Sequence, residues 1–139
     1  MESTVRWLAP MEFVAETGSG HALVLDGAEE FGGRNLGPRP MEMLLVGLGG
    51  CTNFDVILML KKSRQRITDC QVKVTAERAE NEPKVFTKIH VHFIVSGHDI
   101  DENKVKRAID LSAEKYCSAS IMLGATAEIT HDFEIQSAA

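Results

Sequence analysis

Hydrophobic and polar residues alternate along the start of the chain in a way that predicts short β-strands. Val5 and Trp7, and after a proline Phe13 and Ala15, are separated by polar or charged residues, as in strands with one buried face. The stretch TGSGH is typical of a turn, and HALVLDG of a third strand. We therefore expect a meander of antiparallel strands over residues 4–26, followed by a Gly- and Pro-rich loop.

A long apolar segment after this loop predicts an α-helix from about Met41 to Arg64. Pro40 suits the first turn of a helix, and the basic stretch KKSRQR suits its C-terminal end. Apolar residues lie on nearly all sides, which is typical of a helix buried inside a fold. A membrane-spanning helix is the alternative, but Glu42, Asn53 and the nearby glycines favour a buried helix of a soluble protein.

The second half of the chain predicts a hairpin, another helix and a final strand. CQVKVTAERAE and VFTKIHVHFIVSG alternate with a period of two. DIDENKVKRAIDLSAEKYC predicts an amphipathic helix, with Asp99 and Glu102 at capping-box spacing. ATAEITHDFEI is the last strand. The order is β-β-β-α-β-β-α-β, so the fold class is α+β, and we expect a single domain over residues 1–139. The buried stripe of the second helix is expected to comprise Val105, Ala108, Ile109 and Ser112.

Charge and the N-terminal sequence narrow the possible partners. The net charge is −5 and the pI is near 5.5, with Lys and Arg scattered along the chain, so we expect no binding of nucleic acid. MESTVRWLAP lacks the basic start and apolar core of a secretory signal, and we therefore expect a cytoplasmic protein that does not associate with membranes. In a reducing compartment, the three cysteines are expected to be reactive or buried rather than structural cross-links.

The cysteines differ in their sequence surroundings. Cys70 is in phase with Val72 and Val74, so we interpret it as a small hydrophobic residue on a buried strand face. Cys51 lies within the apolar run GLGGCTNFDVILML, and Cys117 follows the amphipathic helix in EKYCSAS. Residue types alone leave open whether Cys51 and Cys117 form a redox pair, because pairing between distant positions cannot be deduced from their spacing.

Other chemical motifs are weaker. His90 and His92 have the spacing of two metal ligands on one strand face, but their alternation with apolar residues favours the solvated side of an amphipathic strand. The sequence lacks CxxC, HExxH and phosphate-loop motifs, and no serine lies at a nucleophile elbow. We therefore expect neither a metal nor a cofactor, and we interpret Gly47, Gly49 and Gly50 as close-packing positions.

Two blocks of sequence point to a known family. GPRPMEMLLVGLGGCTNFDVI and AIDLSAEKYCSASIML, together with the order of strands and helices, resemble the OsmC/Ohr family of osmotically induced and organic hydroperoxide resistance proteins. The resemblance covers nearly the whole chain. It is greatest to the short YhfA-like branch, in which RQ..DC.VK, FT.I..HFIV.G and LSAEKYCS recur.

This resemblance implies a thiol peroxidase that reduces organic hydroperoxides in an oxidative stress response. Cys51 matches the family's peroxidatic cysteine, and Cys117 matches the resolving cysteine that forms a disulfide with it. A dithiol of the dihydrolipoyl type is the implied reductant. The family is similar in fold, with a long buried central helix packed against curved antiparallel sheets in an intertwined homodimer. Its sites lie at the subunit interface, where an apolar pocket can hold the tail of a hydroperoxide.

The chain also departs from the family pattern. Peroxidatic members carry an arginine in the turn between early strands, paired with a glutamate ten positions before the reactive cysteine. Here the turn TGSGH has no arginine, and Met41 lies ten positions before Cys51. Glu42 is nine positions before Cys51, roughly two and a half helical turns away, and is expected to point to the opposite face. A peroxidase, a dimer that binds an apolar or acyl ligand, and a purely structural dimer remain three hypotheses. Peroxide-dependent consumption of the thiols is the most informative single measurement, because only the peroxidase requires it.

Overall fold

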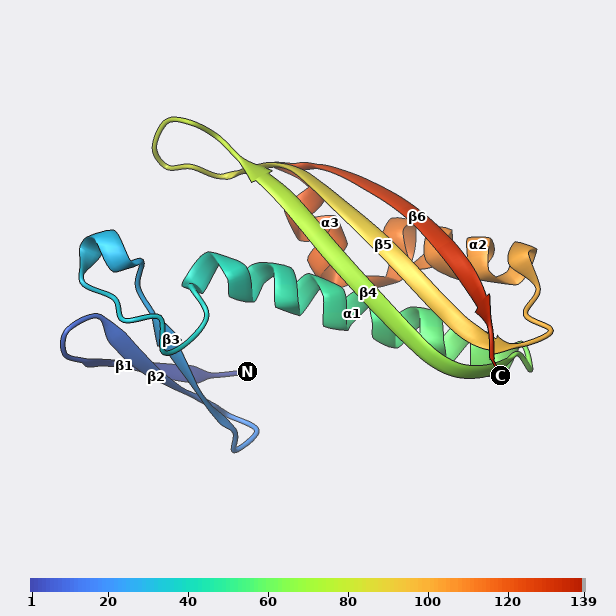
Figure 1. Cartoon of the computed structure of the whole chain (residues 1–139), viewed down its shortest axis with the longest axis horizontal. Coiled ribbons are helices and arrows are strands. Elements are labelled where there is room, and N and C mark those ends of the chain that lie inside the picture. Colours follow the sequence, from blue (N-terminus) through green and yellow to red (C-terminus); the bar gives the residue numbers. More distant parts are fainter. Residues whose placement is uncertain (139) are drawn as a thin grey trace. The chain divides into compact units, whose positions relative to one another are not determined.

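The computed structural model describes residues 1–138 and has an α+β fold with two three-stranded sheets and three α-helices. The chain consists of two compact units, one comprising residues 1–44 and the other beginning at Leu45. The helix α1 runs from the first unit into the second (Figure 1). The α+β class predicted from the sequence is confirmed, and the assignment of residues 1–139 to a single domain stays a prediction.

The first unit is the predicted meander. Its strands are β1 (Ser3–Leu8), β2 (Glu12–Thr17) and β3 (Ala22–Asp26), which pair antiparallel in that order. Asp26 is fully buried at the end of β3, where its carboxylate accepts hydrogen bonds from the backbone N–H groups of Arg34 at 3.0 Å and Leu36 at 3.1 Å. The hydrogen bond from Arg34 is the main reason that the pKa of Asp26 is lowered. These bonds hold the Gly-rich loop against the meander.

The helix α1 comprises Pro40–Lys62, within two residues of its predicted bounds. At its start, the Glu42 carboxylate accepts a hydrogen bond of 2.8 Å from the backbone N–H of Arg39, the role of the acidic residue in a capping box. At its end, Arg64 has a left-handed backbone conformation, and the N–H of Gln65 bonds to the carbonyl of Leu60 at 2.9 Å. This geometry is a common helix terminator.

One face of α1 is buried and another is exposed. The buried positions recur every four residues, whereas large apolar side chains on other sides remain in contact with solvent, with Phe54 67% exposed and Val46 60% exposed. In the single chain, α1 is therefore buried on one face, and the predicted burial on its other sides is not observed. By length and composition alone, α1 could also cross a membrane, with a mean hydropathy of 1.8. Its buried residues are Leu48, Thr52, Val56 and Leu60.

The second unit contains the larger sheet. Its strands are β4 (Arg66–Arg78), β5 (Phe86–His98) and β6 (Glu128–Ser137), with β5 in the centre. The β4–β5 hairpin is antiparallel, as predicted, but β6 pairs parallel to β5. The prediction of antiparallel sheets is therefore wrong for this pair. The reason is that the chain returns to the sheet through a helical crossover, which brings β6 back in the direction of β5.

This crossover contains the helices α2 (Glu102–Leu111) and α3 (Ser118–Gly124), separated by a π-helical turn over Ser112–Tyr116. The predicted cap at Asp99 is wrong. Asp101 caps α2, because its carboxylate accepts a hydrogen bond of 2.9 Å from the N–H of Asn103. Asp99 instead has a left-handed conformation and pairs with Arg66 at 2.7 Å. The predicted buried stripe of Val105, Ala108, Ile109 and Ser112 is confirmed.

The crossover helices and the second half of α1 cover one face of the β4–β5–β6 sheet, which we call the inner face (Figure 1). It carries the best-buried apolar side chains of the protein. The opposite, outer face carries the residues that alternate with them along each strand, including His90 and His92. The inner-face residues of β5 are Ile89, Val91, Phe93 and Val95, each at most 1% exposed.

Candidate active site

Cys51 lies on α1, half-buried, on the side of the helix where glycines leave room. Gly47 is one helical turn before Cys51 on the same face, and a Cβ atom added to Gly47 or Gly50 would meet nothing within 4 Å. Gly49 differs, because an added Cβ atom would lie 3.4 Å from a methyl group of Val74. That distance is an ordinary van der Waals contact, so the interpretation of the three glycines as close-packing positions is wrong for the single chain. The space beside Cys51 at Gly47 is open among the described residues.

Cys117 lies between the π-helical turn and α3 and is fully buried. Its backbone N–H donates to the carbonyl of Ser112 at 2.8 Å. Its sulfur accepts a hydrogen bond of 3.3 Å from the backbone N–H of Ser120 and so caps α3. The position of the sulfur is thus fixed by backbone groups on both sides, and π-helical turns of this kind are frequent at functional sites.

The fold brings the Cys51 and Cys117 side chains together although they are distant in sequence. The pKa of Cys117 is raised, first because the thiol is buried, and to a smaller extent because Cys51 lies close to it. Hydrogen bonds from Ser120 partly oppose this effect.

A buried polar network fixes the crossover against α1 next to the two thiols. The Ser112 hydroxyl lies 2.8 Å from the hydroxyl of Thr52 and donates to the carboxylate of Asp55 at 3.0 Å. Thr52 follows Cys51 directly on α1, and the Ser112 carbonyl holds the N–H of Cys117. Buried hydroxyl groups that are fully hydrogen-bonded give a core a specific arrangement. Ser112 is therefore a positioning residue for the cysteine pair.

Cys70 is separate from this pair. It lies on β4, where its carbonyl oxygen accepts a hydrogen bond of 2.9 Å from the side-chain amide of Asn53. Burial, and to a lesser extent the charge of Asp69, raises the pKa of its thiol to about 11. All three cysteines are free thiols. The interpretation of Cys70 as a small residue on the covered strand face agrees with its half-buried position.

Comparisons with known proteins identify the family of this chain. The family model of the OsmC-like proteins matches residues 32–132. The chain belongs to the OsmC-like family. It is 45% identical to protein YhfA of Escherichia coli over 138 residues, which are 99% of this chain and 100% of YhfA. The predicted resemblance to OsmC/Ohr proteins, and to the YhfA-like branch, is confirmed.

Solved structures show the same fold. An OsmC-like protein from Mycoplasma pneumoniae matches with a TM-score of 0.81 and 20% identity, over 96% of this chain and 95% of that one. The organic hydroperoxide resistance protein OhrB of Bacillus subtilis matches with a TM-score of 0.63 and 18% identity, over 96% of each chain. The length and hydropathy of α1 are also compatible with the core helix of a soluble protein.

The two departures from the family pattern have structural counterparts. In the turn that lacks arginine, the Thr17 and Ser19 hydroxyls bond to each other at 2.9 Å, and Ser19 bonds to a ring nitrogen of His21 at 3.1 Å. Glu42 is engaged in capping α1. Within residues 45–138, the ion pairs of Arg and Lys side chains join them to carboxylates away from Cys51.

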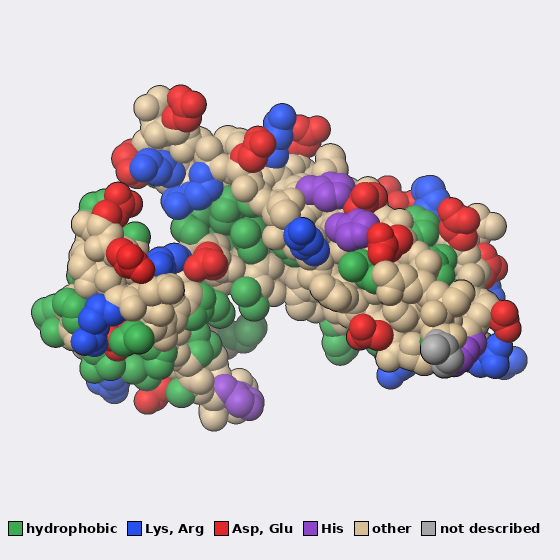
Figure 2. Space-filling model, in the orientation of Figure 1, with side chains coloured by type: hydrophobic (Ala, Val, Ile, Leu, Met, Phe, Trp, Pro, Cys, Tyr) green, Lys and Arg blue, Asp and Glu red, His purple; other side chains and the backbone are tan. Residues whose placement is uncertain are grey.

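The two strand histidines are on the outer face, as the alternation predicted, but they have partners that sequence reasoning missed. Asp132 on β6 bonds to both rings. Figure 2 shows histidine side chains (purple) next to acidic ones (red) at this surface. The alternation of THDFE along β6 could have indicated that Asp132 lies on the same kind of solvated strand face as the histidines. That it lies next to His92 depends on the parallel register of β5 and β6, which only the structure reveals.

Proposed function

We propose that this OsmC-like protein is a cysteine-based peroxidase that reduces organic hydroperoxides. The Cys51 thiolate attacks the terminal oxygen of the O–O bond, which releases an alcohol and leaves a sulfenic acid on Cys51. The sulfur of Cys117 then attacks the sulfur of Cys51, forms a disulfide and releases water. A dithiol of the dihydrolipoyl class returns the disulfide to two thiols by exchange, and is itself oxidised to a cyclic disulfide.

The proximity of Cys51 and Cys117 carries this proposal. The roles follow from the surroundings of each thiol, because Cys117 is fully buried and its pKa is raised, whereas Cys51 is half-buried beside open space at Gly47. A nucleophile must be reached by its substrate, and a resolving thiol must be reached only by the first sulfur. This arrangement supports Cys51 as the peroxidatic cysteine and Cys117 as the resolving one.

The substrate class follows from the apolar surroundings of Cys51. Val46, Phe54 and Leu58 leave apolar surface exposed on α1, and a pocket formed where a second copy meets this surface can bind the hydrocarbon part of an organic hydroperoxide, which hydrogen peroxide lacks. The solved relatives of this fold include an organic hydroperoxide resistance protein. We also propose a cytoplasmic location, since a reducing compartment supplies the dithiols that the cycle consumes.

Peptide mapping after oxidation tests the assignment of the thiols. The protein is treated with about one equivalent of an organic hydroperoxide and digested without reductant. We expect a single disulfide between Cys51 and Cys117, with Cys70 still free for alkylation after unfolding. A bridge that contains Cys70, or the absence of any bridge, would overturn the proposal.

Variants separate the chemical role of Cys51 from a general effect of removing a thiol. Cys51→Ser should lower hydroperoxide consumption by at least about a thousandfold, because no other group replaces a missing nucleophile. Cys70→Ser is the matched control and should retain the activity. Cys117→Ser should stop disulfide formation and leave a sulfenic acid on Cys51, which a dimedone-type reagent can trap.

We further propose that the protein is a homodimer in which a second copy covers the exposed apolar side of α1. Phe54 is 67% exposed and Leu58 is 41% exposed, and contiguous apolar surface on a soluble protein marks an interface. Sedimentation velocity at micromolar concentration should give the mass of a dimer. Phe54→Asp should abolish the dimer, whereas Lys61→Asp, an exposed position near the end of the same helix, should not. A folded monomer of the unchanged chain would contradict this proposal.

The alternative function is binding of an apolar or acyl ligand without chemistry. Two observations support this alternative. The arginine and glutamate partners of peroxidatic family members are absent at the matched positions, and Glu42 serves as a helix cap. Such a protein would bind a fluorescent fatty acid and would consume no hydroperoxide. Loss of binding after Phe54→Asp, together with unchanged thiols after peroxide treatment, would support it.

A further inference from the structure

Two histidines and a carboxylate meet on the outer face of the β4–β5–β6 sheet, away from the thiols. The parallel register places His90 beside Thr130 and His92 beside Asp132. Residues two apart on a strand share a face, so all these side chains stand together. His90 Nε2 and His92 Nδ1 each lie 2.7 Å from the same oxygen, Oδ1 of Asp132.

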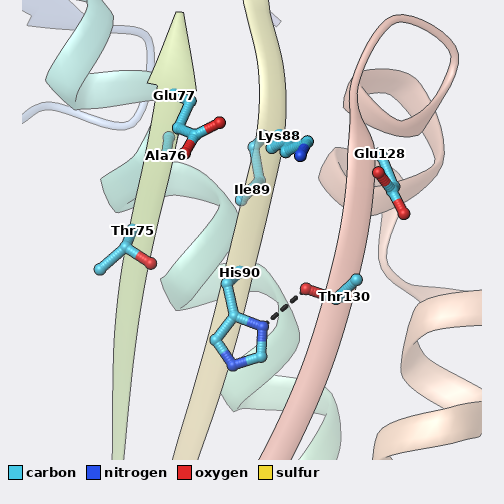
Figure 3. A pocket seen from close by; sticks show the side chains of 8 residues that line it. All are labelled: Thr75, Ala76, Glu77, Lys88, Ile89, His90, Glu128 and Thr130. Carbon is cyan, nitrogen blue, oxygen red and sulfur yellow. Dashed lines mark hydrogen bonds between the residues drawn. The ribbon is translucent and has the colours of Figure 1, made fainter.

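The remaining nitrogen of each ring also has a partner. His90 Nδ1 lies 2.6 Å from the hydroxyl oxygen of Thr130, the contact drawn as a dashed line in Figure 3. His92 Nε2 lies 3.4 Å from the carboxylate of Glu134. In the metal-free protein His90 Nε2 and His92 Nδ1 bond to Asp132. Once an ion takes the place of these bonds, Thr130 and Glu134 can accept the ring N–H groups, so that the lone pairs of the other two nitrogens, His90 Nε2 and His92 Nδ1, face the ion. Metal-binding histidines are usually oriented in this way by an acceptor on the second nitrogen.

The spacing of the three donor atoms suits a small metal ion. All of them lie within 4.8 Å of one another. Bonds of about 2.0–2.2 Å in a tetrahedral site place ligand atoms roughly 3.4 Å apart, so the present contacts of 2.7 Å need to open only slightly. Imidazole and carboxylate donors suit Zn²⁺ and similar ions, whereas Mg²⁺ and Ca²⁺ take oxygen ligands.

We propose that His90 Nε2, His92 Nδ1 and Asp132 bind one divalent transition-metal ion of the Zn²⁺ class, with water at the fourth position. The charges around the site favour binding of a cation. The two carboxylates of Asp132 and Glu134 outweigh the single ammonium group of Lys73, which lies opposite His92 on the neighbouring strand β4. The site lies on the opposite face of the sheet from Cys51, and it is independent of the thiol chemistry.

Titration of the metal-free protein with Zn²⁺, followed by calorimetry, tests this site. We expect one ion per chain. His90→Gln, His92→Gln and Asp132→Asn should each weaken the affinity at least about 100-fold, and Thr130→Val, which removes only an orienting contact, about tenfold. His98→Gln is the matched control, because His98 is exposed at the end of the same strand and outside the cluster, and its loss should change nothing.

Two further measurements exclude binding by the thiols and do not depend on variants at the site. The double change Cys51→Ser and Cys117→Ser should leave the affinity unchanged. In the unaltered protein, nitrogen NMR should show Zn²⁺-dependent shifts of His90 Nε2 and His92 Nδ1. Absence of binding, binding that survives His92→Gln and Asp132→Asn, or binding that is lost with the two cysteines would overturn the proposal.

Discussion

The inner and outer faces of the β4–β5–β6 sheet carry titratable groups under opposite conditions of solvation. For Cys70 on the inner face, and for Cys117 in the crossover that covers this face, burial is the first cause that raises the pKa. On the outer face, the hydrogen bond between His92 and Asp132 is the first cause of both shifts. It raises the pKa of His92 and lowers the pKa of Asp132. One sheet thus creates two kinds of chemistry.

The difference shows how the two sites depend on the fold. The thiol pair requires that α1 and the crossover pack together, because its members come from separate elements and are held by buried hydrogen bonds. The histidine and aspartate cluster requires only the register of two adjacent strands. Changes in packing should therefore damage the inner site and spare the outer one.

The largest expected effect concerns the solvation of Cys70. A pKa of about 11 in place of 9.0 leaves about 100-fold less thiolate near neutral pH, and the thiolate is the species that reacts. Native protein should therefore react with iodoacetamide at Cys70 about 100-fold more slowly than the unfolded chain does, as followed by mass spectrometry. Equal rates before and after unfolding would break the comparison, because the inner face would then be accessible to solvent.

The next effect concerns the hydroxyl that joins the crossover to α1. Ser112→Ala removes the hydrogen-bond partner of the buried Thr52 hydroxyl and of the partly buried Asp55 carboxylate, and should lower the free energy of unfolding by about 1–3 kcal/mol. Disulfide formation between the two cysteines should slow as well. Urea denaturation measures the first quantity and timed quenching the second. Ser118→Ala, at an exposed position next to Cys117, is the matched control and should have little effect on stability.

A smaller effect is expected from the carboxylate at the start of α1. Glu42 caps the helix through the N–H of Arg39, and a glutamine can accept the same bond. Glu42→Gln should therefore change the rate constant of Cys51 with hydroperoxide by less than about threefold, under about 1 kcal/mol in the barrier. Stopped-flow kinetics measures this. A loss of a hundredfold or more, with Cys51 still reduced and the fold intact, would show that Glu42 takes part in the chemistry.

The smallest effect is a pH dependence of stability from the outer face. Because the pKa of His92 in the folded state lies above 6.5, its contribution to stability is fully present below about pH 6.5 and is lost as the pH rises through the raised value. Asp132→Asn should return the pKa of His92 toward its ordinary value, as followed by NMR titration. It should also weaken this pH dependence, whereas Glu128→Gln, farther along the same strand, should not.

Much of the fold could be predicted from local patterns. Period-two alternation indicates the strands of both sheets, and the spacing of Val105, Ala108 and Ile109 indicates the buried side of α2. Both follow from side-chain directions within a single element. The cap of α2 was predicted at Asp99 instead of Asp101, because the left-handed conformation of Asp99 and its pairing with Arg66 involve a residue far away in sequence.

The sequence by itself determined most of the strands and helices and, through family resemblance, which two cysteines are the candidates for a redox pair, Cys51 and Cys117. Only the tertiary structure decided that β6 runs parallel to β5, that a π-helical turn holds the buried Cys117 against Cys51, and that Asp132 joins the two histidines. The physical reason is that sequence patterns are local, whereas these contacts join residues far apart in the sequence. Periodicity records which side of an element is buried, but contacts between elements depend on the crossover and the strand register, which no local pattern contains.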